Sequence, residues 1–84
     1  MHFWRDKSGR EVDFVVKKGR EVVAVECKVN PDRFDPSSLL AFRALVPKGR
    51  DYLVCPGVEK PYSRRAGGRT VRVAGCGDLL KELA

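Results

Sequence analysis

Two valine-rich segments on either side of a glycine constrain the fold of this 84-residue chain more than any other feature. Residues 11–16 and 22–29 are rich in β-branched side chains and contain neither glycine nor proline, and Gly19 lies in the short connection between them. This pattern predicts two antiparallel strands joined by a tight turn. We therefore expect a β-hairpin at the centre of the structure.

Three charged residues interrupt these apolar strands. Asp13 lies on the first strand, and Glu26 and Lys28 lie on the second. Because side chains alternate across a strand, Glu11 and Asp13 should share one face of the first strand, and Glu26 and Lys28 one face of the second. Each pairing of the two strands considered below puts Asp13, Glu26 and Lys28 on the same face of the sheet. The second strand is almost entirely apolar before Glu26, which indicates a central strand whose far end opens into a site.

Two pairings of the hairpin are compatible with the sequence. A two-residue loop at 18–19 places Asp13 opposite Ala24 with Glu26 on the diagonal, whereas a four-residue loop places Asp13 directly opposite Glu26. Diagonal neighbours on a sheet face are roughly 7–8 Å apart at Cα, and opposed ones are closer. Carboxylates at this spacing repel unless a cation lies between them, and a hard divalent cation suits carboxylate oxygens. The alternative is three charges on a solvated sheet face.

The stretch HFWRDKSGREVDF from His2 to Phe14, followed by the Glu26-Cys27-Lys28 triplet, carries a family resemblance. It is similar to the metal-binding core of the PD-(D/E)xK nuclease superfamily, with Asp13 as the motif aspartate. More narrowly, it resembles an uncharacterised C-terminal domain that follows AAA+-type ATPase modules in many bacterial and archaeal proteins. Later segments with the same likeness are Phe42-Arg43, Tyr52-Leu53-Val54, Pro61-Tyr62 and Arg64-Arg65.

The resemblance implies a restriction-endonuclease-like α/β fold in a single domain, 1–84. Its mixed sheet would have about five strands, one packing helix and a short C-terminal helix. It also implies Mg²⁺- or Mn²⁺-dependent hydrolysis of DNA, with Asp13, Glu26 and Lys28 as catalytic residues. Asp13 and Glu26 would hold the ion, and Lys28 would orient the attacking water or steady a phosphate.

The sequence departs from the superfamily pattern in two places. Val12 stands where proline often precedes the motif aspartate. Active members also have a helix before the first strand that supplies another metal-binding glutamate, and no such helix precedes the strand expected at residues 1–5. Glu11 is the candidate substitute ligand, unless another chain completes the site. The alternative is a truncated or minimal, catalytically inactive module that binds nucleic acid or protein.

Basic residues outnumber acidic ones by 17 to 11, which gives a formal net charge of +6. Such a charge suits an anionic partner, and the nuclease resemblance makes DNA the expected one. The segment 56–68 is expected to form a loop with basic residues around Tyr62, although an ordinary solvated loop is the alternative. The candidate phosphate contacts are Lys60, Arg64, Arg65 and, from the packing helix, Arg43.

The remaining elements follow from the positions of proline, glycine and apolar residues. The expected strands are 1–5, with Phe3 inward and Trp4 packed on the other face, then 51–55 and 69–74. The expected helices are one capped by Asp35 with an apolar stripe at 39–46, and one capped by Asp78 over 79–84. A crossover through the first helix should make the strands at 22–29 and 51–55 parallel.

Three cysteines without paired spacing favour neither a zinc site nor a disulfide framework. The sequence has no signal peptide and no apolar run of membrane-spanning length, so the expected compartment is the cytoplasm and no membrane partner is expected. A sheet without its first helix would expose apolar surface. We therefore expect a homodimer, or attachment to an ATPase module in a longer protein.

Overall fold

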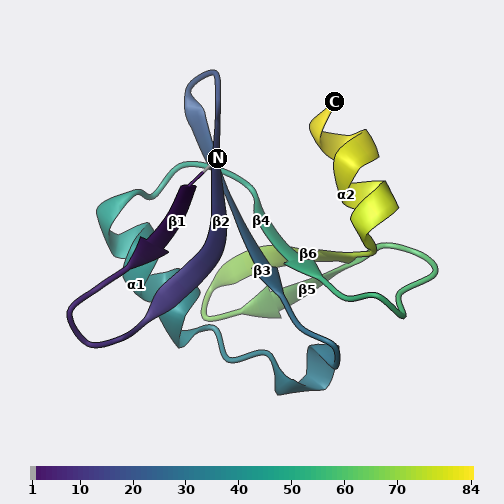
Figure 1. Ribbon diagram of the computed structural model, residues 1–84, viewed down its shortest axis with the longest axis horizontal. Coiled ribbons are helices and arrows are strands. Elements are labelled where there is room, and N and C mark those ends of the chain that lie inside the picture. Colours follow the sequence, from purple (N-terminus) through teal and green to yellow (C-terminus); the bar gives the residue numbers. More distant parts are fainter. Residues whose placement is uncertain (1) are drawn as a thin grey trace.

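The computed structural model describes residues 2–84, over which a six-stranded mixed sheet and two helices form a small α/β fold (Figure 1). The sheet order is β1-β2-β3-β4-β6-β5, with β3, β4 and β6 parallel to one another. Met1, which belongs to the first expected strand, lies outside the described residues. The elements are β1 (His2–Arg5), β2 (Glu11–Lys18), β3 (Glu21–Cys27), the 3₁₀ turn η1 (Pro31–Arg33), α1 (Ser37–Leu45), β4 (Asp51–Val54), β5 (Tyr62–Ala66), β6 (Arg69–Ala74) and α2 (Cys76–Leu83).

The central hairpin has the second of the two expected pairings. Val15 lies opposite Ala24 and Lys18 opposite Glu21, so that the turn consists of Gly19 and Arg20 alone. In this register position 13 is aligned with position 26. The strands continue to pair up to Lys18 and Glu21, so the turn has two residues instead of the expected four. The parallel pairing of β3 and β4 confirms the expected crossover through α1.

The two helices cover opposite faces of the sheet. Leu53 of β4 packs in the same buried cluster as Phe42 of α1, whereas the next residue, Val54, packs in the cluster that contains Leu79 of α2. Since neighbouring residues of a strand point to opposite faces, the clusters form two apolar layers, one on each side of the sheet. Both layers are small because the chain is short.

The first strand packs Trp4, as expected from its size, but exposes Phe3. Trp4 faces α1, where its ring lies 5.4 Å from the Phe42 ring in an edge-to-face arrangement. Phe3, expected to point inward, is 70% exposed. The reason is the position of the helices: α1 lies under the β1 side of the sheet, while α2 packs over β4 and leaves the other face of β1 uncovered (Figure 1).

The prediction of a loop over 56–68 is wrong for the second half of that segment. Residues Tyr62–Ala66 form β5, which pairs antiparallel with β6 at the edge of the sheet. The turn between them is Gly67-Gly68, and both residues have positive φ, at 57° and 82°. A glycine pair immediately before a strand is a hairpin signal. The edge position explains why β5 has so few apolar residues.

The helices begin close to their expected positions. The Asp35 carboxylate accepts a 2.9 Å hydrogen bond from the Ser37 backbone N–H, although Pro36 rather than Asp35 occupies the N-cap position. Helix α2 begins at Cys76, three residues before the expected start, so Asp78 lies in its first turn instead of capping it. An acidic residue in the first turn still favours a helix through its interaction with the helix dipole.

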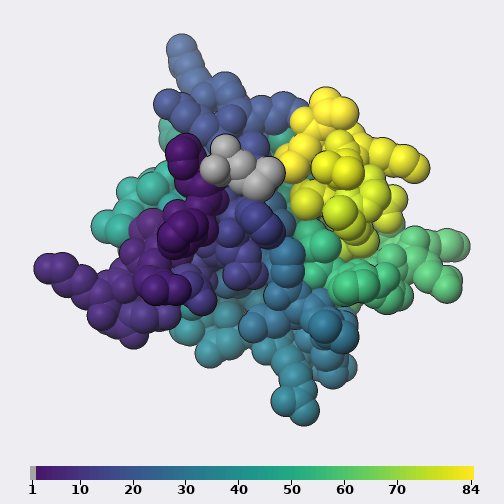
Figure 2. Space-filling model, in the orientation of Figure 1, coloured from purple at the N-terminus to yellow at the C-terminus, as the bar shows by residue number. Residues whose placement is uncertain are grey.

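The face that carries α2 has exposed apolar side chains. Figure 2 shows the surface of α2 in yellow beside the blue surface of the hairpin formed by β2 and β3. Phe14 is 41% exposed and Leu80 is 64% exposed, and both border an apolar pocket of about 200 Å³. These side chains belong to the exposed apolar surface through which the expected self-association would occur.

Within residues 2–84, neither helix has the length or apolar composition that crossing a membrane requires.

Candidate functional site

A β-bulge in β2 positions the first candidate residue. His2 pairs with Val15 and Trp4 with Val12, so three steps along β2 span only two along β1. As a result both Val12 and Val15 pack in the α1-side cluster, which corrects the strict alternation expected for residues 11–16. Bulges commonly re-aim a side chain near functional sites. The re-aimed residues here are Asp13 and Phe14.

The carboxylate of Asp13 reaches the second strand of the hairpin. Its Oδ2 atom accepts a 2.9 Å hydrogen bond from the backbone N–H of Cys27. Cys27 separates Glu26 from Lys28, so the Asp13 carboxylate lies directly beside the Glu-Cys-Lys triplet. The side chain of Asp13 remains solvent-exposed.

Glu26 is the most unusual residue of the site. It lies beside Leu53 in the centre of the sheet and is only 7% exposed. Its Oε2 atom is buried and has no hydrogen-bond partner among residues 2–84. An unpartnered buried carboxylate oxygen is costly, because folding removes it from water without replacing the lost hydrogen bonds.

Burial and a neighbouring negative charge perturb the titration of Glu26. Desolvation and, to a smaller extent, the Asp13 charge raise its pKa to about 7, whereas the Lys28 charge opposes the shift. Lys28 itself directly follows β3, is exposed, and donates its backbone N–H to the Val54 carbonyl at 3.0 Å. The three residues thus interact through space, and Glu26 takes up and releases its proton near neutral pH.

Glu11, the candidate third ligand, is occupied elsewhere. The Arg5 guanidinium binds Glu11 Oε2 through Nη2 at 3.0 Å and Nε at 3.2 Å, across the β1–β2 pair. Among the side chains of residues 2–84, no group of three or more His, Cys, Asp or Glu is arranged to hold a metal ion. The site therefore offers two carboxylates, those of Asp13 and Glu26.

Arg43, one of the predicted phosphate contacts, is buried in an ion pair. Arg43 is only 4% exposed, and its Nε atom lies 2.7 Å from Oδ1 of the buried Asp51. Its other nitrogens donate to the backbone carbonyls of Val46, Lys48 and Arg50. A carboxylate at the start of a buried strand needs a cationic partner. Arg43 is that partner, and it also holds the segment after α1.

The other basic candidates do not form one cluster. Arg64 and Arg65 are neighbours on β5 and therefore point to opposite faces of the sheet. Arg64 donates to the Pro31 carbonyl at 3.0 Å and stacks over Phe34 on the α1 side. Arg65 is exposed on the α2 side, and Lys60 is exposed in the loop before β5.

A second group of arginines escaped the sequence reasoning. Arg50, Arg69 and Arg72 lie on or beside two parallel strands, and together with Arg65 they border a pocket of about 470 Å³. They are far apart in sequence and none belongs to a recognisable motif. The available signal was the parallel pairing of β4 with β6, which brings residues 50–52 beside residues 69–72.

Comparison with known families gives one match. A family model described as a domain of unknown function, DUF4143, matches residues 1–74, which include the whole sheet and α1 but not α2. Domains of this family typically follow AAA ATPase modules. No curated protein and no solved structure matches the chain significantly. The chain belongs to the DUF4143 family.

Proposed function

We propose that this domain has a restriction-endonuclease-like fold of the PD-(D/E)xK type and acts as a metal-dependent nuclease-like domain on DNA. Asp13 and Glu26 would hold Mg²⁺ or Mn²⁺, and Lys28 would act beside them. The observation that carries the proposal is the buried Oε2 atom of Glu26, which has no hydrogen-bond partner within residues 2–84 and lies in a strand contacted by the Asp13 carboxylate.

The donor set fits a hard divalent cation. A cation would compensate both the desolvated Glu26 carboxylate and the neighbouring Asp13 charge, the two main causes that raise the pKa of Glu26. Mg²⁺ commonly binds through one or two carboxylates and completes its shell with water and substrate phosphates. Two protein ligands are therefore sufficient. When bound, such an ion polarises a phosphoryl oxygen and lowers the pKa of bound water.

The chain's own residues would fix the substrate around that position. The hydrogen bond from the Cys27 backbone restrains the Asp13 carboxylate, and Glu26 is restrained by burial in the sheet. Lys28 is exposed at the end of β3 and can place its ammonium group against a phosphate or a water molecule. The net charge of +6 supports an anionic polymer as substrate.

Cleavage assays test this proposal. Supercoiled plasmid, duplex and single-stranded DNA would be incubated with the unmutated chain and Mg²⁺ or Mn²⁺. We expect Lys28→Ala and Asp13→Asn each to reduce the rate by about 100-fold or more, which is the usual cost of removing a charge-stabilising group. Lys7→Ala, an exposed lysine in the β1–β2 turn, is the control. Failure of the unmutated chain to cut any DNA form would defeat the activity.

A second candidate is a catalytically inactive domain of the same architecture that binds nucleic acid or protein beside an ATPase module. The ion pair between Arg5 and Glu11 favours it, because this pair withdraws the third acidic side chain from the site. The exposed Phe3 and Phe14 beside Asp13 also favour it, since they offer apolar docking surface. Calorimetry that detects DNA binding but no Mg²⁺ or Mn²⁺ uptake would select this function. A protein that only dimerises would show no salt-dependent DNA binding.

A further inference from the structure

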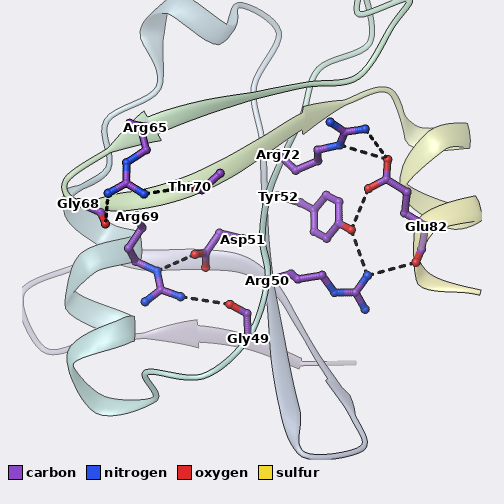
Figure 3. Close-up of a pocket in the computed structure, with 10 residues that line it drawn as sticks. All are labelled: Gly49, Arg50, Asp51, Tyr52, Arg65, Gly68, Arg69, Thr70, Arg72 and Glu82. Carbon is purple, nitrogen blue, oxygen red and sulfur yellow. Dashed lines mark hydrogen bonds and ion pairs between the residues drawn. The ribbon is translucent and has the colours of Figure 1, made fainter.

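An arginine-lined pocket lies at the opposite end of the sheet from the carboxylate site. Its volume is about 470 Å³, and it opens around the first residues of β4 and β6 (Figure 3). Asp13 contacts Cys27, which is the last residue of β3. Because β3 runs parallel to β4 and β6, this contact lies at the end of the sheet where the parallel strands finish, whereas the pocket lies where β4 and β6 begin. The two sites are therefore separated along the strand direction and use different residues.

The pocket gathers side chains from three adjacent strands onto the α2 face. Tyr52 of β4 pairs with Arg72 of β6, and Thr70 of β6 pairs with Arg65 of β5. Tyr52 belongs to the buried cluster on the α2 side, and its partner Arg72 therefore projects to that side. Thr70 lies two residues before Arg72, so Thr70 and its partner Arg65 project to the same side as well. Figure 3 shows Arg65 beside Thr70 and Arg72 beside the helix that carries Glu82.

Positive charge exceeds negative charge in the pocket lining. The lining contains four arginines but only two carboxylates, those of Asp51 and Glu82. The Asp51 carboxylate is fully engaged, because it is buried and bound on one oxygen by Arg43 and on the other by Arg69. Arg50 is neutralised from outside the lining by Glu21, with a contact of 2.6 Å.

Arg65 differs from the other three arginines in its partners. Its guanidinium donates to the Thr70 hydroxyl and to the Gly68 carbonyl, each at 2.9 Å, and both acceptors are uncharged. Its side chain is exposed. These two hydrogen bonds hold the guanidinium in place without neutralising its charge, so it is oriented and available for an anion.

An anionic group already occupies the other end of the pocket. The Glu82 carboxylate accepts hydrogen bonds from the Tyr52 hydroxyl at 3.0 Å and from Arg72 at 3.3 Å (Figure 3). The Arg72–Glu82 pair is partly exposed, and such pairs contribute little to stability. Arg72 can therefore exchange this carboxylate for a stronger anionic ligand at small cost.

We propose that this pocket binds phosphate at two points, through the Arg65 guanidinium and the Thr70 hydroxyl at one end and through the Arg72 guanidinium at the other. Guanidinium forks match phosphate oxygens in shape and charge, and they bind them more strongly than neutral donors do. The phosphate belongs either to a nucleic-acid backbone or to a small ligand such as a nucleotide. The inference is independent of the proposed metal site, since it uses none of the residues Asp13, Glu26 and Lys28.

The test combines nuclear magnetic resonance with binding assays on the full chain. Inorganic pyrophosphate and short single-stranded and duplex DNA would be added separately, and the backbone amides of residues 63–72 would be followed. We expect these amides to shift. If pyrophosphate displaces DNA, the pocket accepts phosphate from either source. If only DNA shifts the amide signals, the ligand is the phosphate backbone of a nucleic acid. If only pyrophosphate shifts them, the ligand is a small phosphate compound. No shift with any probe would overturn the proposal.

Matched variants sharpen the test. We expect Arg65→Gln and Arg72→Gln each to weaken binding of the effective probe by about five- to tenfold and, for DNA, to lower the salt slope by about one. Glu82→Gln should strengthen binding, because it removes the competing carboxylate. Arg10→Gln, which removes an equal charge from the β1–β2 turn, should change affinity by less than about twofold. Equal affinities for Arg65→Gln, Arg72→Gln and the unmutated chain would contradict the assignment. DNA cleavage, measured in parallel, reports on the other site separately.

Discussion

The Oδ2 atom of Asp13 lies 2.9 Å from the backbone nitrogen of Cys27, the residue between Glu26 and Lys28. This hydrogen bond joins the two halves of a motif that are a whole strand apart in sequence. It depends on the bulge in β2, which turns the residues between Val12 and Val15 out of the regular alternation. The site is thus a consequence of how the first three strands pair.

The pH dependence of stability should depend on Glu26. Its folded-state pKa is about 7 and its ordinary value is 4.5, so between these values the folded chain binds a proton that the unfolded chain has lost. The contribution of Glu26 is therefore most favourable below about pH 4.5, declines towards about pH 7, and is constant above it. Urea unfolding of the unmutated chain and Glu26→Gln at about pH 5 and about pH 8 measures this difference.

We expect Glu26→Gln to be more stable than the unmutated chain at about pH 8, by roughly 1–2 kcal/mol, because it removes a desolvated charge. At about pH 5 the advantage should shrink, since Glu26 is then largely protonated in the folded state. Glu59→Gln, in an exposed loop, is the control. A stability difference that does not change with pH would show that Glu26 is not a perturbed acid.

Loss of the buried Arg43 should be far more damaging than loss of its partly exposed neighbour Arg69. Both bind Asp51, but Arg43 also donates to three backbone carbonyls and is almost fully buried. Removing one partner of a buried ion pair typically costs about 3–5 kcal/mol. We expect Arg43→Ala to approach this cost and Arg69→Ala to remain well below it. Thermal unfolding of the two variants provides the comparison, and equal losses would contradict the described network.

Gly49 should tolerate no side chain. Its φ is +146°, and a Cβ atom built on it would lie 1.8 Å from the carbonyl oxygen of Val22. Gly49→Ala would therefore force the start of β3 away from the segment before β4, at a cost of about 2 kcal/mol or more. Gly57→Ala is the matched control, because a Cβ atom there would meet nothing within 4 Å and its φ is not in the left-handed region. Similar melting temperatures for both variants would refute this packing.

The first strand offers a paired test of which side faces the core. Trp4 packs on Phe42, whereas Phe3 is 70% exposed. We expect Trp4→Ala to lower the free energy of unfolding by about 3 kcal/mol and Phe3→Ser to change it by less than about 0.5 kcal/mol. Denaturant titrations followed by circular dichroism measure both. A larger loss of stability in Phe3→Ser than in Trp4→Ala would mean that Phe3, and not Trp4, faces the core.

Much of the architecture was predictable because it depends on local patterns. The valine-rich hairpin, the helix after Pro36 and the strand Asp51–Val54 each follow from periodicity and from their flanking glycine or proline residues. The parallel β3–β4 pair follows from the connecting helix. The hairpin register was enough to predict that position 13 lies near the Glu-Cys-Lys triplet, whereas the contact of the Asp13 carboxylate with Cys27 also depends on the bulge.

The remaining features depend on packing that the sequence does not encode locally. The bulge arises from the pairing of β1 with β2, so alternation misplaced Val12. Arg43 seemed a surface residue because its buried partner, Asp51, follows eight residues later. The strand β5 has a polar sequence and forms at the sheet edge, where pairing with β6 replaces the missing apolar signal.

The most direct test of the proposed metal site is a Mn²⁺ titration followed by nuclear magnetic resonance. Bound Mn²⁺ broadens the signals of nearby amides. We predict selective loss of the amide signals around Asp13 and around Glu26 to Lys28 in the unmutated chain, and their retention in Asp13→Asn at the same Mn²⁺ concentration. Broadening that is absent, or that is equal in the two proteins, would contradict a cation held by Asp13 and Glu26.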